Sequence, residues 1–123
     1  MSIIINDGNL TGYIIIDGNG CLFGIVKGNE KMVLHSFTVE IPIRKRQHLE
    51  AYESKRIRKI QLYMQEVSDI ATLLVLPTHN IILAGAADLK YNLKPWLDNL
   101  NVIKVIDVSY GMQPGFCQAI ELS

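Results

Sequence analysis

A change of hydrophobic period at Pro42 is the feature that most constrains the fold. From Leu34 to Ile41 apolar and polar residues alternate, which predicts a β-strand with one covered face. From about Gln47 to Leu76 apolar residues recur at three- and four-residue steps without Gly or Pro. That pattern predicts a long amphipathic helix of about 28 residues. The chain therefore requires a sheet and a long helix that packs on it.

Two further strands are expected before this change. The β-branched runs 12–16 and 21–26 flank Asp17-Gly18-Asn19-Gly20, a composition that favours a tight hairpin turn. A second turn at 27–30 leads to a third strand at 32–41, so the first third is predicted to be a three-stranded antiparallel meander. Residues 1–11 are either a short strand or a frayed leader.

After the long helix, apolar runs alternate with helical patterns. The predicted elements are a buried strand, a short helix with Asp88 in its first turn, one further helical turn, a second buried strand and a final helix, at 81–84, 86–93, 96–100, 102–108 and 116–122. The last two strands are expected to be parallel because helices connect them. The predicted fold class is α/β, a mixed sheet of the meander plus two strands, covered by one long helix and shorter ones.

Size and composition predict a single domain over residues 1–123. The hydrophobic content is 49% and the charged content 20%, which argues against disorder. No apolar run reaches the roughly 18 to 20 residues that span a bilayer, and the start does not resemble a signal peptide. Cys21 and Cys117 show neither pairing nor metal spacing, so both are predicted to be buried, reduced thiols of a cytoplasmic protein. Membrane binding is not expected.

The net charge of zero hides a basic arm, which we define as residues 42–59. Seven of the 12 Lys and Arg residues lie there, opposed only by Glu50 and Glu53. Such a block is either a solvated face or a surface that binds phosphate. Because the charges are segregated by sign, the two interpretations are about equally supported. The basic residues are Arg44, Lys45, Arg46, Lys55, Arg56, Arg58 and Lys59, and His48 lies beside them.

Other candidate chemistry has ordinary structural explanations. Asp17 and Asp107 end apolar strands and could hold Mg²⁺ for a metal-dependent nuclease, but a turn and a strand end also favour aspartate. The glycines near Gly20 lie between two strands with no helix to receive a dinucleotide. His35 falls on the covered face of a strand and is interpreted as a core histidine. No metal or cofactor site is therefore predicted.

Four stretches of the chain resemble a known family. GYIIIDGNGCLFG, LHSFTVEIP, ILAGAADLK and VIDVSYGMQPGFCQAIELS are similar, in order and spacing, to the middle domain of the eukaryotic and archaeal class-1 peptide chain release factors. The resemblance runs from about Gly12 to Ser123. Pelota-type ribosome-rescue factors share the domain but are more distant in these motifs.

The resemblance implies a ribonuclease-H-like fold and a role in translation termination. In that family a Gly-Gly-Gln loop at the head of the long helix enters the ribosomal peptidyl transferase centre and promotes hydrolysis of the peptidyl-tRNA ester. The implied partners are rRNA, the acceptor end of peptidyl-tRNA and, in the full-length factor, a termination GTPase. The match begins after the codon-reading domain and stops before the domain that recruits the GTPase, so this stretch alone is not expected to decode stop codons.

The loop departs from the family pattern. Gln47 takes the place of the glutamine, but Lys45 and Arg46 precede it, and the connection from Pro42 is shorter by a few residues. Glycines serve there because the backbone adopts conformations open to Gly and approaches RNA without a Cβ. Hydrolysis is therefore expected to be impaired while binding through the basic arm is kept. The alternative is a Pelota-like or inactive paralogue that binds ribosomes without hydrolysis.

Overall fold

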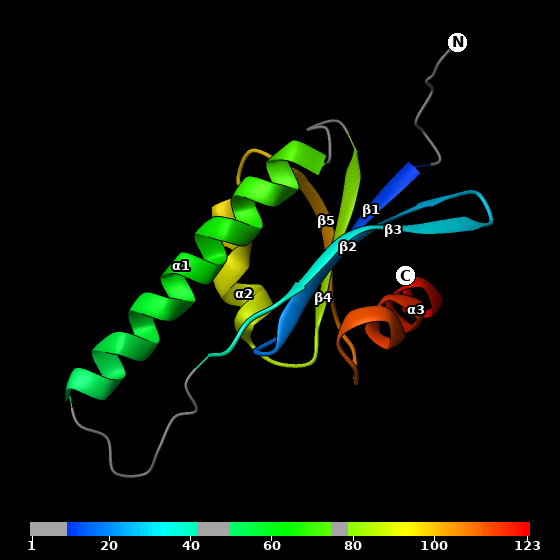
Figure 1. Ribbon diagram of the computed structural model, residues 1–123. Helices are drawn as coiled ribbons and strands as arrows, with labels where there is room; N and C mark the ends of the chain where they lie inside the picture. The colour runs from blue at the N-terminus through cyan, green and yellow to red at the C-terminus, as the bar shows by residue number, and fades with distance from the viewer. Residues whose placement is uncertain (1–9, 42–49, 75–78) are drawn as a thin grey trace.

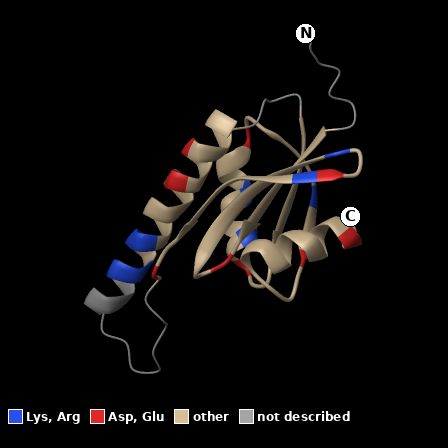
Figure 2. Ribbon diagram, turned by 45° about the vertical axis from the view of Figure 1, so that its right-hand side comes forward, with Lys and Arg blue, Asp and Glu red and all other residues tan. Residues whose placement is uncertain are grey.

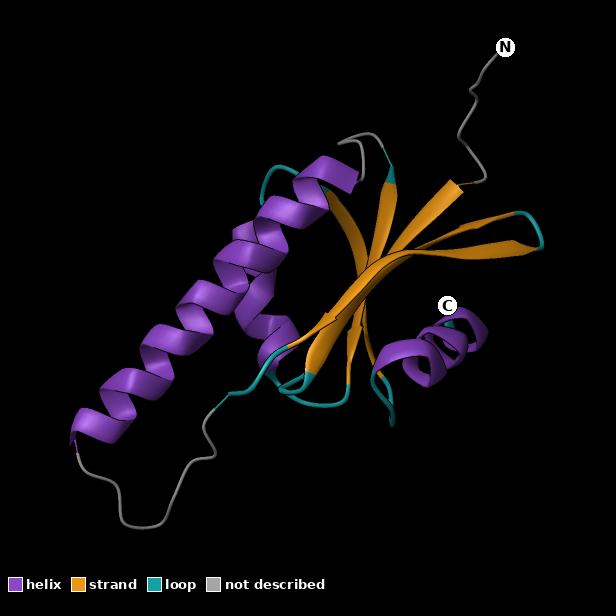
Figure 3. Ribbon diagram, viewed as in Figure 1, coloured by secondary structure: helices purple, strands orange, loops and turns teal. Residues whose placement is uncertain are grey.

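A five-stranded mixed sheet forms the centre of the computed structural model. The structure describes residues 10–41, 50–74 and 79–123; for residues 50–53 it describes the backbone only. In the sheet the strand order is β3-β2-β1-β4-β5, as Figures 1 and 3 show. The β1–β2 and β2–β3 pairs are antiparallel, and the β1–β4 and β4–β5 pairs are parallel. This confirms the predicted meander and the parallel pair. The strands are β1 (Leu10–Ile16), β2 (Gly20–Lys27), β3 (Glu30–Thr38), β4 (Asn80–Gly85) and β5 (Asn101–Asp107).

Helices cover both faces of the sheet. One face carries α1 and α2, and α3 lies on the other (Figures 1 and 3). The predicted element order and the α/β class are thus confirmed. The helices are α1 (Glu50–Leu74), α2 (Leu89–Leu93), the 3₁₀-helix η2 (Lys94–Leu97) and α3 (Met112–Leu122).

Alternation along the central strand β1 divides the core into two layers. Ile14 and Ile16 pack with α1, α2 and η2, whereas Tyr13 and Ile15 pack with α3. All four side chains are buried. Since β1 has a strand on each side and a helical layer on each face, its apolar run has no exposed face.

The predicted core face of the long helix is confirmed in its second half. Tyr63, Met64, Val67 and Ala71 are buried at helical spacing against the sheet. The helix begins at Glu50 and ends at Leu74 within the described residues, inside the predicted span. The first described turns of α1 project beyond the sheet in Figure 1.

Three predictions after α1 were wrong in detail. The second helix begins at Leu89, with Asp88 as an N-cap residue that makes no side-chain cap bond. The next turn, η2, includes Pro95, which is tolerated because the first N–H groups of a helix have no intrahelical partner. The last helix begins at Met112, four residues early, since Pro114 lies in its first turn.

Three burial predictions were also wrong. The strand β5 was expected to be buried, but it lies at the edge of the sheet, and each of its residues is either half-buried or exposed. Cys117 is exposed on α3, where its Sγ accepts a 2.9 Å hydrogen bond from Lys31 Nζ, while Cys21 is buried as predicted. His35 is exposed on the outer meander strand, where its ring stacks 6.3 Å from that of Phe23.

Candidate nucleic-acid interface

The head of α1 carries the described half of the basic arm. Lys55, Arg58 and Lys59 are exposed there, and Figure 2 shows the blue cations on the first described turns with red carboxylates farther along the helix. Arg56 is half-buried and lines a separate hollow with Trp96. The remaining predicted site residues lie outside the described residues, namely Arg44, Lys45, Arg46, Gln47 and His48.

The three exposed cations repel one another. Lys55 is three residues from Arg58 and four from Lys59, the spacings at which helix side chains become neighbours. Like charges at such spacings destabilise a helix by about 0.2–0.5 kcal/mol per pair. In the described part of the chain no carboxylate pairs with any of the three. An anion bound at this face would relieve the repulsion.

An apolar groove lies beside these cations, between the end of β3 and α1. Its volume is about 440 Å³, and its lining is almost entirely apolar. Lys and Arg contribute to such a lining with their aliphatic stems while the charged ends stay in water. We call it the α1 groove. It is lined by Val39, Lys55, Arg58, Lys59, Leu62, Tyr63 and Glu66.

Tyr63 fixes the wall of the α1 groove to the sheet. Its hydroxyl donates a 2.9 Å hydrogen bond to the backbone carbonyl of Asp17, in the β1–β2 turn. Its ring meets that of Phe37 edge-on at 6.0 Å. Burial, with smaller effects from Cys21 and Asp17, raises the pKa of the Tyr63 hydroxyl well above its usual range. The side chain therefore stays neutral and holds α1 at a fixed position over the meander.

The Asp17 carboxylate has a structural role. Its Oδ1 accepts hydrogen bonds from the backbone N–H groups of Asn19 and Gly20, at 2.8 and 3.1 Å. On the other side the carboxylate lies against Gly111, where a Cβ would come within 2.1 Å of Oδ2. The turn and the start of the α3 segment are thus packed together through this side chain.

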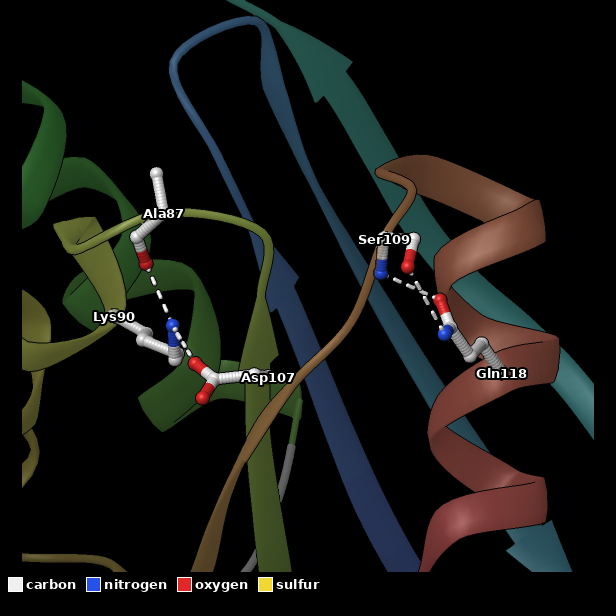
Figure 4. Close-up of polar contacts among 5 residues, drawn as sticks. All are labelled: Ala87, Lys90, Asp107, Ser109 and Gln118. Carbon is white, nitrogen blue, oxygen red and sulfur yellow. Dashed lines mark hydrogen bonds and ion pairs between the residues drawn. The ribbon is translucent and has the colours of Figure 1, made fainter.

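Asp107 is engaged by a buried lysine. Lys90, only 1% exposed, donates to the carbonyl oxygen of Ala87 at 2.7 Å and pairs with Asp107 Oδ1 at 2.6 Å (Figure 4). Among the described residues no three His, Cys, Asp or Glu side chains are placed to hold a metal ion. The nuclease alternative therefore lacks structural support in this part of the chain.

At the same end of the sheet, the segment that leads from β5 to α3 is held by a hydrogen bond to α3. In Figure 4 the Gln118 side chain points from α3 to Ser109: its Oε1 accepts from the Ser109 N–H at 2.6 Å. The carboxyl ends of β4 and β5 are therefore occupied by contacts that connect α2, β5 and α3.

Sequence reasoning missed several residues of the site. Val39, Leu62 and Glu66 were not singled out, although Leu62 and Glu66 follow Lys55 at seven and eleven residues, on one helical face. That spacing was the available signal. Lys90 was also missed, although it is the last residue of the ILAGAADLK motif that carried the family resemblance.

Comparison with known proteins identifies the family. The family model described as eRF1 domain 2 matches residues 10–123. The chain belongs to this family. The eukaryotic peptide chain release factor subunit 1 of Loxodes striatus is 39% identical over 125 residues, which covers 91% of this chain and 29% of the relative. That of Dictyostelium discoideum is also 39% identical, with 28% of its length covered. The chain thus spans less than a third of the curated relatives it matches.

Solved structures agree with the fold of the eRF1 domain 2 family. An archaeal translation termination factor, aRF1, has a TM-score of 0.76 at 24% identity over 93% of this chain and 34% of that one. The Pelota protein of Thermoplasma acidophilum has a TM-score of 0.65 at 10% identity over 92% and 32%. Within the described residues no helix is long and apolar enough to cross a membrane.

The curated matches also differ from this chain in length. The alignment with the Loxodes striatus relative is 125 positions long but includes only 91% of the 123 residues of this chain. Some of its positions are therefore gaps in the sequence of this chain. The relative therefore carries residues within the matched span that this chain lacks.

Proposed function

We propose that this chain is one release-factor domain that acts at the ribosomal peptidyl transferase centre in translation termination. The exposed cations of α1 contact rRNA and the acceptor end of peptidyl-tRNA. The observation that carries the proposal is the group of three cations without a described carboxylate partner, at the head of the long helix of an eRF1 domain 2 chain. Lys and Arg side chains that neutralise the phosphates of a nucleic acid release its counterions, and this release favours binding.

The proposal includes impaired ester hydrolysis by this chain. Lys45 and Arg46 precede Gln47 where the family carries two glycines, and their side chains add bulk and charge at the point of closest approach to RNA. The residues that the curated relatives have and this chain lacks are consistent with a shortened connection between β3 and α1. In the full-length factor a termination GTPase is the further partner, and the cytoplasm is the place of action.

A peptidyl-tRNA release assay tests the proposal with the domain placed in a full-length release factor. We expect ribosome binding with slow release, faster release after Lys45→Gly with Arg46→Gly, and loss of that gain after Gln47→Ala. Leu73→Ala is the matched control, because Leu73 is 84% exposed on the far half of α1. Release as fast as that of a Gly-Gly-Gln factor would refute the impairment, and failure to bind ribosomes would refute the function.

The second candidate is a Pelota-like role in ribosome rescue, with binding and no hydrolysis. The absence of Gly-Gly before Gln47 favours it. The glycine variants separate the two candidates. Release that stays absent in them, with binding kept, would support the rescue role.

A further inference from the structure

We infer that the α1 groove binds one unpaired RNA nucleotide, with its base on Leu62 and Val39 and its phosphate beside the exposed cations. The inference rests on the proposed function, since it names the RNA element that the head of α1 receives. Two features of the groove carry it: an apolar surface left open to solvent and cations placed at one end only.

The floor of the groove offers a surface for a base. Leu62 is 63% exposed although it adjoins the buried Tyr63, and Val39 is half-buried at the opposite wall. Open apolar surface in a concave site is favourable to cover. The face of a nucleobase is flat and apolar, so it can cover Leu62 and Val39, and burial of apolar surface contributes about 25 cal/mol per Å² removed from water.

Charge at the rim selects a nucleotide over an apolar ligand. Lys55, Arg58 and Lys59 lie along the part of the groove nearest the start of α1, and Glu66 lies at the other end. A phosphate is attracted to the cationic end and repelled by the Glu66 carboxylate, so the nucleotide has one preferred direction. The Glu66 carboxylate can accept a hydrogen bond from a base amino group. A phosphodiester has no hydrogen-bond donor and cannot make this contact.

The size of the groove fits a single unpaired nucleotide. Its volume of about 440 Å³ lies within the roughly 300–1,000 Å³ of pockets that hold small molecules. Duplex RNA keeps its bases stacked inside the helix, so a duplex has no free base face to place in the groove. An unpaired strand can turn one base outward and into the groove.

Fluorescence anisotropy on the full chain tests the inference with two labelled probes. One is a five-nucleotide adenine RNA, and the other is an abasic strand of the same length and charge. We expect the adenine RNA to bind about tenfold more tightly, which at about 25 cal/mol per Å² corresponds to about 55 Å² of apolar surface covered by the base. Leu62→Ala is expected to remove most of this preference, and Leu73→Ala, on the same helix outside the groove, to leave it unchanged.

A charge variant separates the phosphate contact from the base contact. Lys55→Ala is expected to weaken both probes by the same factor and to lower the slope of log affinity against log salt by about 0.7. Lys104→Ala, an exposed cation of β5, is the matched control.

The outcomes test the nucleotide-binding inference separately from the proposed function. Equal affinity of the wild type for both probes would overturn the inference and leave the proposed function standing. No binding of either probe would overturn both. Unchanged or tighter adenine binding by Leu62→Ala, or an equal loss in Leu73→Ala, would also overturn the inference.

Discussion

Gly85 at the end of β4 is a position where a single methyl group should open the sheet. A Cβ at Gly85 would lie 2.3 Å from the backbone oxygen of Ile16, at the end of the neighbouring strand β1. Carbon and oxygen in close contact are usually about 3.3–3.6 Å apart, so the two strands must separate by about 1 Å. The obstacle is backbone in a packed core, which cannot rotate away.

The expected cost of Gly85→Ala is at the upper end for overpacking. Such changes usually cost about 1–3 kcal/mol, and we expect about 3 kcal/mol because the obstructing oxygen of Ile16 belongs to the backbone of the sheet. With a urea dependence of about 2 kcal/mol per M, the unfolding midpoint should fall by about 1.5 M. The Gly85 carbonyl also accepts the N–H of Val108 at 3.2 Å, so the path from β5 to α3 should loosen as well.

Urea unfolding followed by circular dichroism is the assay. Gly18→Ala is the matched control: it is also a glycine-to-alanine change, and its Cβ would have nothing within 4 Å. We expect the control to change the free energy of unfolding by less than about 0.5 kcal/mol. If the two variants unfolded at the same urea concentration, the steric argument at Gly85 would be refuted.

Three further predictions concern the core and its polar contacts. Tyr63→Phe should cost about 1 kcal/mol at pH 7 through the lost bond to the sheet. The raised pKa keeps the folded Tyr63 neutral while the unfolded phenol ionises, so wild-type stability is retained below about pH 10 and falls above it. The gap between wild type and variant should therefore narrow between pH 9 and about 11 in urea unfolding, and a constant gap would contradict this. Asp107→Ala should cost about 1–2 kcal/mol because it leaves the buried Lys90 ammonium without its carboxylate, and a second change, Lys90→Met, should restore part of the loss in a double-mutant cycle. Val67→Ala should cost about 1–3 kcal/mol in a thermal melt, whereas Leu73→Ala, 84% exposed, should leave the melting temperature almost unchanged.

Much of the candidate site could be inferred from the order of residues. The basic block before and within α1 is contiguous, so its charge was evident without a fold, and Lys55, Arg58 and Lys59 are exposed as expected. The α1 groove was not inferred, because Val39 approaches Leu62 only when β3 and α1 pack together. No local pattern encodes that distance.

The succession of elements, the core face of the long helix and the family could be inferred from the sequence alone. The period of 3.6 residues follows from local backbone geometry, so Val67 could be placed on the core face of the long helix from spacing alone. Burial at the sheet edge and the pairing of Lys90 with Asp107 were decided by tertiary structure. Each depends on which segments distant in sequence become neighbours, and the free energy of those contacts exists only after the sheet has assembled.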